Sequence, residues 1–257
     1  MARLTRLDRV EHTTGFTGPP LTPRTAVIWS VLAAELARRD GDQLTVLDVG
    51  GGTGGFAVPL ARAGHWVTVV DASPDALAAL TRRAAEAGVA DRVRAVQGDG
   101  DALGGLVEPA GADLVLCHSV LEVVDDPAPV AAALAAALRP GGAASVLVAG
   151  RAAAVLSRAM NGHLDVAAAL AAAPAGSAGP RDTLRRRFDS DSAAALLGAA
   201  GLTVEEIHGV RVLADLLPAT VADGQPAALV ELERALAARS PYRELAAQLH
   251  LFARRPA

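Results

Sequence analysis

The sequence contains no lysine, so all 24 of its basic residues are arginine, whereas 28 residues are acidic and the formal net charge is −4. This balance excludes the extended positive surface of a protein that binds nucleic acid without specificity, although it leaves room for a local basic patch. Aromatic residues make up only 3% of the chain, so few rings are present to stack on bases.

Cysteine is also scarce. The one cysteine, Cys117, excludes a disulfide within the chain and is typical of a protein of the reducing cytosol. The stretch 1–15 is charged and has no apolar run of the kind that signal peptides carry. The longest apolar stretch, residues 128–138, is too short to span a bilayer. We therefore expect a cytoplasmic protein without a membrane contact.

The scattered positions of the six histidines, together with the lone cysteine, exclude the ligand spacings of common metal sites. Hydrophobic residues make up 51% of the 257 residues, which is enough for one sizeable core. We predict a single domain over 1–257, with an N-terminal arm at 1–21 and an insert at 151–187 on the substrate side.

Short apolar runs alternate regularly with helical patterns along the first 150 residues. The predicted strands are 43–49, 66–71, 92–99, 112–119 and 143–150, followed later by 203–217 and 245–255. The predicted helices are 22–39, 56–64, 73–88, 127–142, 189–201 and 226–240. Such alternation predicts an α/β fold, doubly wound, with a mostly parallel seven-stranded sheet and helices on both faces.

Five glycines occur in the nine residues of "LDVGGGTGG", directly after the first predicted strand. Read as G-x-G-x-x-G, with Gly50, Gly52 and Gly55, the segment is typical of a dinucleotide site. Read as G-x-G-x-G, with Gly54 as the third glycine and Asp48 before the first, it is typical of an S-adenosylmethionine site. A tight turn that binds nothing is the third interpretation.

Asp71 ends the second predicted strand, where a carboxylate accepts hydrogen bonds from both hydroxyl groups of a ribose. Both cofactors place an acid here, so Asp71 predicts a nucleoside without choosing between them. After the third strand, Asp99 and Asp101 are placed to hold an adenine amino group.

The sequence "LRPGG" (138–142) precedes the fifth predicted strand. Together with the glycine loop and Asp71, it resembles the class I S-adenosylmethionine-dependent methyltransferases, whose Rossmann-like sheet ends with an antiparallel strand near the C-terminus. The resemblance implies that S-adenosylmethionine is the cofactor and S-adenosylhomocysteine the product, and from the histidine and cysteine positions we expect no metal. The residues it implies for the cofactor are Gly50, Gly51 and Gly52 beside the methionine portion, Asp71 at the ribose, and Gly100 and Asp101 beside the adenine.

Four further segments, "TPRTAVIW", "LCHSVLEVVDDP", "HGVRVLADLLP" and "ARSPYRELAAQLHLFARRP", resemble the tRNA 5-carboxymethoxyuridine methyltransferase family. The resemblance implies methylation of the carboxylate of a modified wobble uridine, which needs no general base because the carboxylate is already ionised. It also implies that Arg24 contacts the cofactor carboxylate, as a guanidinium can. His118, at the end of the fourth strand, is either a cofactor or substrate contact or a buried, hydrogen-bonded histidine.

The sequence says less about the residues that bind the methyl acceptor than about those that bind the cofactor. We predict that RNA contacts come from an arginine cluster and that three further residues line or position the acceptor. The arginines are Arg181, Arg185, Arg186 and Arg187, and the further residues are Asn161, Arg211 and Tyr242.

Two alternatives stay open. One is a methyltransferase of the same fold that acts on a small carboxylate or hydroxyl metabolite. The other is a nicotinamide-dependent oxidoreductase or a nucleoside-binding module without chemistry. The oxidoreductase is disfavoured because a chain without lysine cannot supply a Tyr-x-x-x-Lys pair.

Overall fold

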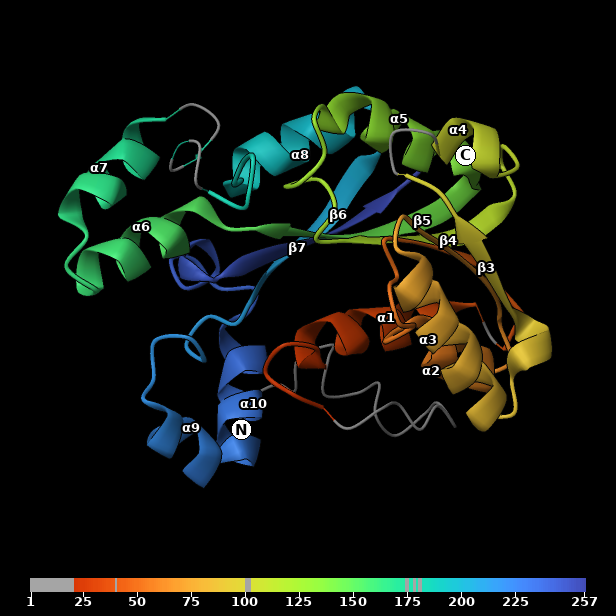
Figure 1. The fold of residues 1–257 in the computed structure, drawn as a ribbon, viewed down its shortest axis with the longest axis horizontal. Helices are drawn as coiled ribbons and strands as arrows, with labels where there is room; N and C mark the ends of the chain where they lie inside the picture. The colour runs from red at the N-terminus through yellow and green to blue at the C-terminus, as the bar shows by residue number, and fades with distance from the viewer. Residues whose placement is uncertain (1–20, 40, 100–102, 174–175, 178, 180–181) are drawn as a thin grey trace.

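The seven strands of the computed structural model form one sheet in the order β3-β2-β1-β4-β5-β7-β6 (Figure 1). The model describes residues 21–39, 41–99, 103–173, 176–177, 179 and 182–257. The strands are β1 (Thr45–Val49), β2 (Trp66–Asp71), β3 (Val93–Gln97), β4 (Ala112–His118), β5 (Leu138–Ala149), β6 (Thr203–Val210) and β7 (Gln248–Arg254). Strand β7 pairs antiparallel with both β5 and β6, and the other pairings are parallel. The predicted doubly wound sheet with an antiparallel strand near the C-terminus is confirmed.

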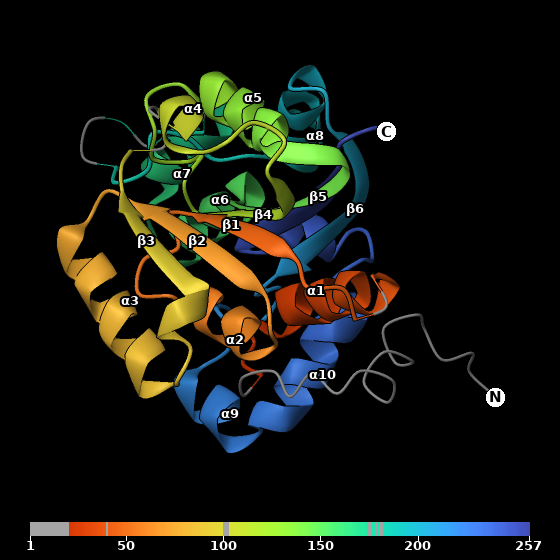
Figure 2. The same ribbon diagram turned by 90° about the vertical axis from the view of Figure 1, so that its right-hand side faces the viewer.

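Helices cover both faces of the sheet. They are α1 (Ala26–Arg38), α2 (Ala57–Arg62), α3 (Pro74–Glu86), α4 (Leu103–Leu106), α5 (Pro127–Ala137), α6 (Arg151–Met160), α7 (Leu164–Ala172), α8 (Ser190–Ala199), α9 (Ala219–Gly224) and α10 (Pro226–Leu236), with 3-10 turns η2 (Ala90–Arg92) and η4 (Arg243–Leu245). Helices α4, α5 and α8 cover one face and α1, α2 and α3 the other, with α10 beside α1 (Figures 1 and 2). Each face therefore has its own apolar core.

Local sequence signals account for several helix starts. Ser73 caps α3 by accepting a hydrogen bond from the Ala76 N–H at 3.2 Å, and Pro74 occupies the first helical position. Asp189 caps α8 as the sequence predicts. Helix α1, however, starts at Ala26 rather than at residue 22, where the predicted helix begins, and the Thr22 hydroxyl contacts the Thr25 hydroxyl instead of capping a backbone N–H.

Two predicted boundaries are wrong because tertiary contacts override the local pattern. The helix predicted at 127–142 ends at Ala137, and the chain is already extended from Leu138, which pairs with Ala112 of β4. The strand predicted at 203–217 ends at Val210, because the next backbone N–H groups donate to the carboxylate of Glu233 on α10. The predicted insert contains the helical hairpin of α6 and α7, and α9 was not predicted.

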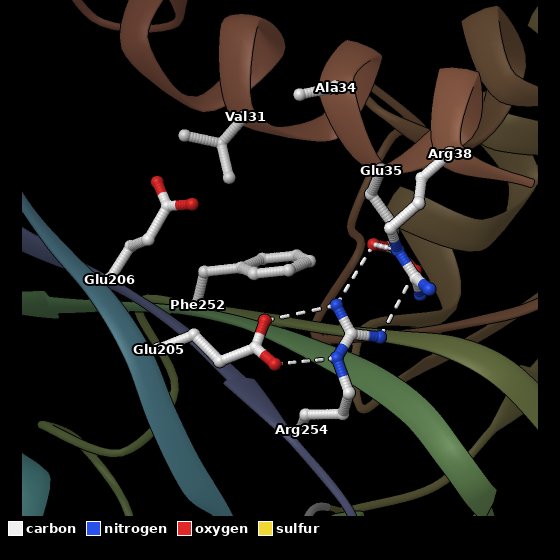
Figure 3. Close-up of a pocket in the computed structure, with 8 residues that line it drawn as sticks. All are labelled: Val31, Ala34, Glu35, Arg38, Glu205, Glu206, Phe252 and Arg254. Atoms are coloured by element: carbon white, nitrogen blue, oxygen red, sulfur yellow. Dashed lines mark hydrogen bonds and ion pairs between the residues drawn. The ribbon is translucent and has the colours of Figure 1, made fainter. Parts of the chain in front are cut away.

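At the amino edge of the parallel strands, Arg254 of β7 joins α1 to β6 (Figure 3). Its guanidinium donates to both carboxylate oxygens of Glu205 and to Glu35 Oε2 at 3.0 Å, and Arg38 donates to Glu35 as well. The Glu35 side chain is only 3% exposed. Burial opposes its ionisation, but hydrogen bonds from Arg38 and Arg254 outweigh this and lower the pKa of Glu35 to about 2. The same residues line a cavity of about 520 Å³.

Replacing Glu35 by glutamine is expected to lower the free energy of unfolding at pH 7 by about 3 kcal/mol, because it leaves Arg254 without one buried partner. Since the folded-state pKa lies below the unfolded value, this contribution is present above about pH 4.5 and is lost as the pH falls towards about 2. Urea titrations of both proteins at several pH values measure the difference. Glu231→Gln, which removes an exposed partner of Arg234, should cost less than about 1 kcal/mol. Equal losses in the two variants would contradict a stabilising role for the buried pair.

Candidate active site

The glycine loop between β1 and α2 lies at the carboxyl edge of the sheet, where ligands of open α/β folds bind. The Gly50 N–H donates to the Val70 carbonyl at 2.7 Å and ties the loop to β2. Gly50, Gly52 and Gly54 have φ angles of +70°, +54° and +81°. This is the left-handed region, which glycine adopts at lower cost than other residues. The backbone thus requires glycine at these three alternate positions.

This geometry distinguishes between the two glycine templates. A Cβ at position 54 would lie 2.3 Å from Cδ1 of Leu80 on α3, so the close packing of α3 against the loop depends on Gly54. A Cβ at position 55 would meet nothing within 4 Å. The third required glycine is therefore Gly54, which favours G-x-G-x-G over the dinucleotide template with Gly55.

Asp48 lies beneath the loop as a buried carboxyl group. A Cβ at Gly51 would lie 2.5 Å from its Cγ and Oδ2. Asp48 is 2% exposed, and its Oδ2 has no hydrogen-bond partner among the described residues. Burial, and then the negative charge of Asp71, raise the pKa of Asp48 to about 7. The sequence marks Asp48 only by its position before the glycines.

Asp71 ends β2 beside this loop, as predicted. Its Oδ2 accepts a hydrogen bond from the Gly52 N–H and its Oδ1 accepts one from the Ser73 N–H, both at 2.9 Å. A carboxylate has about four acceptor positions, so both oxygens can still accept hydroxyl donors. The residue therefore links the glycine loop to α3 and has capacity for a ribose.

His118 ends β4 and contacts Ser145 and Phe56. Its Nε2 lies 2.9 Å from the Ser145 hydroxyl of β5, and its ring meets Phe56 edge-on with centroids 4.7 Å apart. Phe56 in turn stacks on Trp29 of α1. Burial lowers the pKa of His118 to about 4, and its Nδ1 has no partner within the described part of the chain. The ring is therefore neutral at physiological pH.

Further residues that could bind the methyl acceptor lie along the carboxyl edge of the sheet, between the ends of β4 and β6. Ser119 and Arg211 both have positive φ, of +58° and +59°, which places strain where β4 and β6 end. Gln248, which pairs with Ala149 and Val210 at the start of β7, donates its side-chain N–H to the Ser119 hydroxyl at 3.0 Å. Gln248 was not predicted as a site residue, because no local sequence pattern marks it.

Glu122 is a second buried acid near the end of β4. It is 2% exposed, and burial raises its pKa to about 7. Hydrogen bonds from backbone N–H groups and the Ser119 hydroxyl act in the opposite direction but are outweighed by burial. Its backbone carbonyl accepts the N–H of Arg185. The turn after β4 is thereby joined to the insert.

The arginine cluster is largely engaged within the protein. Arg186 donates to the carbonyls of Leu121, Val124 and Asp125, at 2.6 to 2.8 Å. Arg187 is 9% exposed and pairs with Asp182. These contacts favour structural roles for both residues.

Arg185 has a different position within the cluster. Its side chain is 60% exposed, although it contacts the Val123 carbonyl and Asp125. Arg185 therefore remains the candidate RNA contact among the three described arginines.

The remaining predicted site residues lie in separate parts of the fold. Arg24 and Tyr242 are exposed, the former in the turn before α1 and the latter just before η4. Asn161 follows α6 and donates to the Ser157 carbonyl, and Arg211 is paired with Asp215. The predicted residues Gly100, Asp101 and Arg181 lie outside the described residues.

Within the described ranges, no group of three or more histidine, cysteine, aspartate or glutamate side chains could hold a metal ion. No helix in the same ranges is long and apolar enough to cross a membrane.

Comparison with known proteins finds similarity to methyltransferases at the level of the family model, of the sequence and of the fold. A family model described as a methyltransferase domain matches residues 46–142. The chain is 31% identical over 237 residues to the tRNA 5-carboxymethoxyuridine methyltransferase of Escherichia coli K12, covering 91% of this chain and 88% of that protein.

A ubiquinone biosynthesis O-methyltransferase of Xylella fastidiosa is 34% identical over 166 residues, which are 65% of this chain and 63% of that protein. The crystal structure of the magnesium protoporphyrin IX methyltransferase of Synechocystis PCC 6803 with bound S-adenosylhomocysteine has the same fold. It aligns with a TM-score of 0.60 and 17% identity, over 91% of this chain and 84% of that one.

Proposed function

Because the chain belongs to the family of the tRNA 5-carboxymethoxyuridine methyltransferase, and so to the S-adenosylmethionine-dependent methyltransferases, we propose that it methylates the carboxylate of 5-carboxymethoxyuridine at the tRNA wobble position. The observation that carries this proposal is the extent of the relationship, which spans 91% of the chain and not only the glycine-loop half. A cytoplasmic location would follow from a tRNA substrate.

The described residues fit the cofactor. Alternate glycines with positive φ leave the loop backbone accessible, and Asp71 offers acceptors for the ribose at the neighbouring strand end. Arg24 is a candidate partner for the cofactor carboxylate. When bound, S-adenosylmethionine supplies a methyl group that passes from sulfur to an acceptor oxygen in one displacement, leaving S-adenosylhomocysteine and a methyl ester.

The contribution of the protein to such a transfer is orientation. Alignment of two reactants is worth up to roughly 7–11 kcal/mol in well-ordered systems. A carboxylate acceptor is ionised at pH 7 and needs no deprotonation. His118, Ser119 and Gln248 at the ends of β4 and β7 are placed to orient it, with Arg211, Tyr242 and Asn161 as further candidates.

Nucleoside mass spectrometry of tRNA from a strain that lacks the gene tests the proposal. We expect the methyl ester nucleoside to disappear and the free 5-carboxymethoxyuridine to accumulate, with both reversed by the wild-type gene. An unchanged nucleoside profile would contradict a tRNA substrate.

Arg24→Ala is expected to raise the dissociation constant for S-adenosylhomocysteine about tenfold. A hydrogen-bonded contact with a charged group contributes about 1.5 kcal/mol, and Arg24 is exposed and so can form such a contact. Isothermal calorimetry measures the change. Arg62→Ala, which removes an exposed arginine at the end of α2, is the control and should leave the constant unaltered. Equal constants for all three proteins would remove Arg24 from the cofactor site.

Arg185→Ala is expected to reduce the slope of log K for tRNA binding against log salt concentration by about 1, because one phosphate contact is lost. Arg82→Ala on α3 is the control, since that side chain is 70% exposed and makes only a long contact with Glu86. An unchanged slope in Arg185→Ala would place the RNA contacts elsewhere. Replacement of Arg186 or Arg187 is unsuitable for this measurement, because both stabilise the fold.

A small-molecule O-methyltransferase is the second candidate. The similarity to ubiquinone biosynthesis O-methyltransferases over about two thirds of the chain favours it. It would need a base for a hydroxyl acceptor. The pKa values of Glu122 and Asp48 are both raised to about 7, and Glu122 is the one that lies near the end of β4 rather than beneath the glycine loop. Methyl transfer to a hydroxyl compound but not to tRNA would support this candidate.

A further inference from the structure

Arg211 lies directly after β6, at the carboxyl edge of the sheet. Strand β6 runs parallel to β4 and β5, because both β5 and β6 pair antiparallel with β7. Val210, the last residue of β6, pairs with Gln248, and the Arg211 carbonyl accepts the Ala247 N–H at 3.1 Å. The Gln248 side chain in turn donates to the Ser119 hydroxyl after β4. Arg211 is therefore fixed next to residues that we expect to orient the methyl acceptor.

The backbone of Arg211 is held in a conformation that arginine rarely adopts. Its φ of +59° lies in the left-handed region, and such strain persists only where the surrounding contacts impose it. Here α10 imposes it: the buried carboxylate of Glu233 accepts the N–H groups of the three residues that follow Arg211, at 2.7 to 2.8 Å. On the other side, the Gly209 N–H donates to the Ala237 carbonyl at 2.7 Å. Imposed strain of this kind is typical of functional sites and indicates a role for Arg211.

The guanidinium of Arg211 is oriented but only partly occupied. Its Nε donates to Oδ1 of Asp215 at 3.0 Å and its Nη2 donates to Oδ2, so one edge of the planar group holds one carboxylate. A guanidinium has five N–H groups, and in the described part of the chain Arg211 donates only through Nε and Nη2. The side chain is 21% exposed. A second carboxylate can therefore bind through Nη1.

Stability alone does not account for this ion pair. The Asp215 side chain is 45% exposed, and a pair in contact with solvent contributes little to the free energy of unfolding. Such a pair gives no reason to hold Arg211 in a strained conformation. The arrangement instead resembles a preformed site for an anion, which a carboxylate fits better than a neutral hydroxyl group.

We propose that Arg211 binds the carboxylate of the methyl acceptor through Nη1, and that Asp215 is the counter-ion that keeps this contact from holding the carboxylate too tightly to react. The inference rests on the proposed function, since it concerns the acceptor of that reaction.

The need for a counter-ion follows from the charge that methylation removes. As the new C–O bond forms and the C–S bond breaks, with its electron pair left on sulfur, the carboxylate loses its negative charge. A lone guanidinium would stabilise the charged reactant more than the transition state, and would lower KM at the expense of kcat. The neutral pair of Arg211 and Asp215 orients the oxygen with a smaller penalty of this kind.

Binding of two tRNAs in the presence of S-adenosylhomocysteine tests the contact. One carries 5-carboxymethoxyuridine at the wobble position and the other carries its neutral carboxamide, so the two differ in charge but hardly in shape. We expect the wild type to bind the acid at least about tenfold more tightly than the amide. Arg211→Asn should bind both with the affinity that the wild type has for the amide. Asparagine adopts positive φ more readily than most residues, so the backbone is preserved.

Arg239→Asn is the control, because this exposed arginine lies in the turn after α10 and should keep the preference for the acid. A preference that survives in Arg211→Asn would overturn the inference alone. Equal binding of both tRNAs by a wild type that still methylates the acid would do the same. A wild type that neither prefers nor methylates the acid would contradict the proposed function as well.

Asp215→Asn tests the counter-ion. The amide oxygen still accepts one N–H of the guanidinium, so Arg211 stays in place while the negative charge is lost. We expect the KM for the acid tRNA to fall at least about threefold and kcat to fall at least about tenfold, with the dissociation constant for S-adenosylhomocysteine unchanged. Loss of a merely structural contact would not lower KM. An unchanged or raised KM would therefore overturn the role of Asp215 as the counter-ion.

Discussion

Asp71→Ala is expected to weaken binding of S-adenosylhomocysteine by at least about a hundredfold while leaving the protein folded. The variant removes the acceptor for the two ribose hydroxyls, and each hydrogen bond to a charged group contributes about 1.5–3 kcal/mol. It also removes the acceptor that holds the Gly52 N–H at 2.9 Å, so the loop keeps its link from Gly50 to Val70 of β2 but loses the one from Gly52. Isothermal calorimetry measures the affinity, and circular dichroism confirms the fold.

The control for Asp71→Ala is Asp75→Ala, which makes the same change of charge at an exposed position in the first turn of α3. Its affinity should equal that of the wild type. Asp71→Asn should fall between the two, because the amide oxygen can accept from one loop N–H but the amide nitrogen cannot accept from a hydroxyl. If Asp71→Ala bound as tightly as Asp75→Ala, Asp71 would not be part of the cofactor site.

Gly51→Ala is expected to reduce the same affinity by at least about thirtyfold. The new methyl carbon would lie 2.5 Å from the Asp48 carboxyl group and 2.9 Å from Cγ1 of Val69, distances that force the loop or Asp48 to move. Overpacking of this kind costs about 1–3 kcal/mol, and displacing a buried polar group adds about as much. Both costs arise in the segment that we propose contacts the cofactor.

Gly55→Ala, four residues further along the same loop, is the matched control. Its Cβ would meet nothing within 4 Å, so we expect affinity within about threefold of the wild type. The reverse ranking, with Gly55→Ala the more damaging, would indicate that the dinucleotide template describes the loop better than G-x-G-x-G does.

Features with a local cause were predictable from the sequence. The glycine turn, the Ser73 cap with Pro74 after it, and the acid at the end of β2 each involve residues close together in the chain, and the structure has all of them. The seven-stranded sheet with the antiparallel β7 agrees with the family resemblance.

The features that the sequence did not predict depend on contacts between distant residues. The strand at 203–217 is cut short by Glu233, about 20 residues away in the chain, and Gln248 meets Ser119 across 129 residues. The Ser145 contacts with His118 and His250 span 27 and 105 residues. Likewise, the arginine cluster has the pattern of a basic patch, but Arg187 is buried against Asp182. Only the fold shows which charges remain available.

If the protein acts on tRNA as proposed, it forms a methyl ester on a carboxylate of the tRNA. The most direct test incubates the purified protein with S-adenosylmethionine carrying a deuterated methyl group and tRNA from a strain lacking the gene, followed by nucleoside mass spectrometry. We expect one deuterated methyl group on 5-carboxymethoxyuridine, which mild alkali removes because it is held as an ester. Unlabelled tRNA, or a label that survives alkaline hydrolysis, would contradict it.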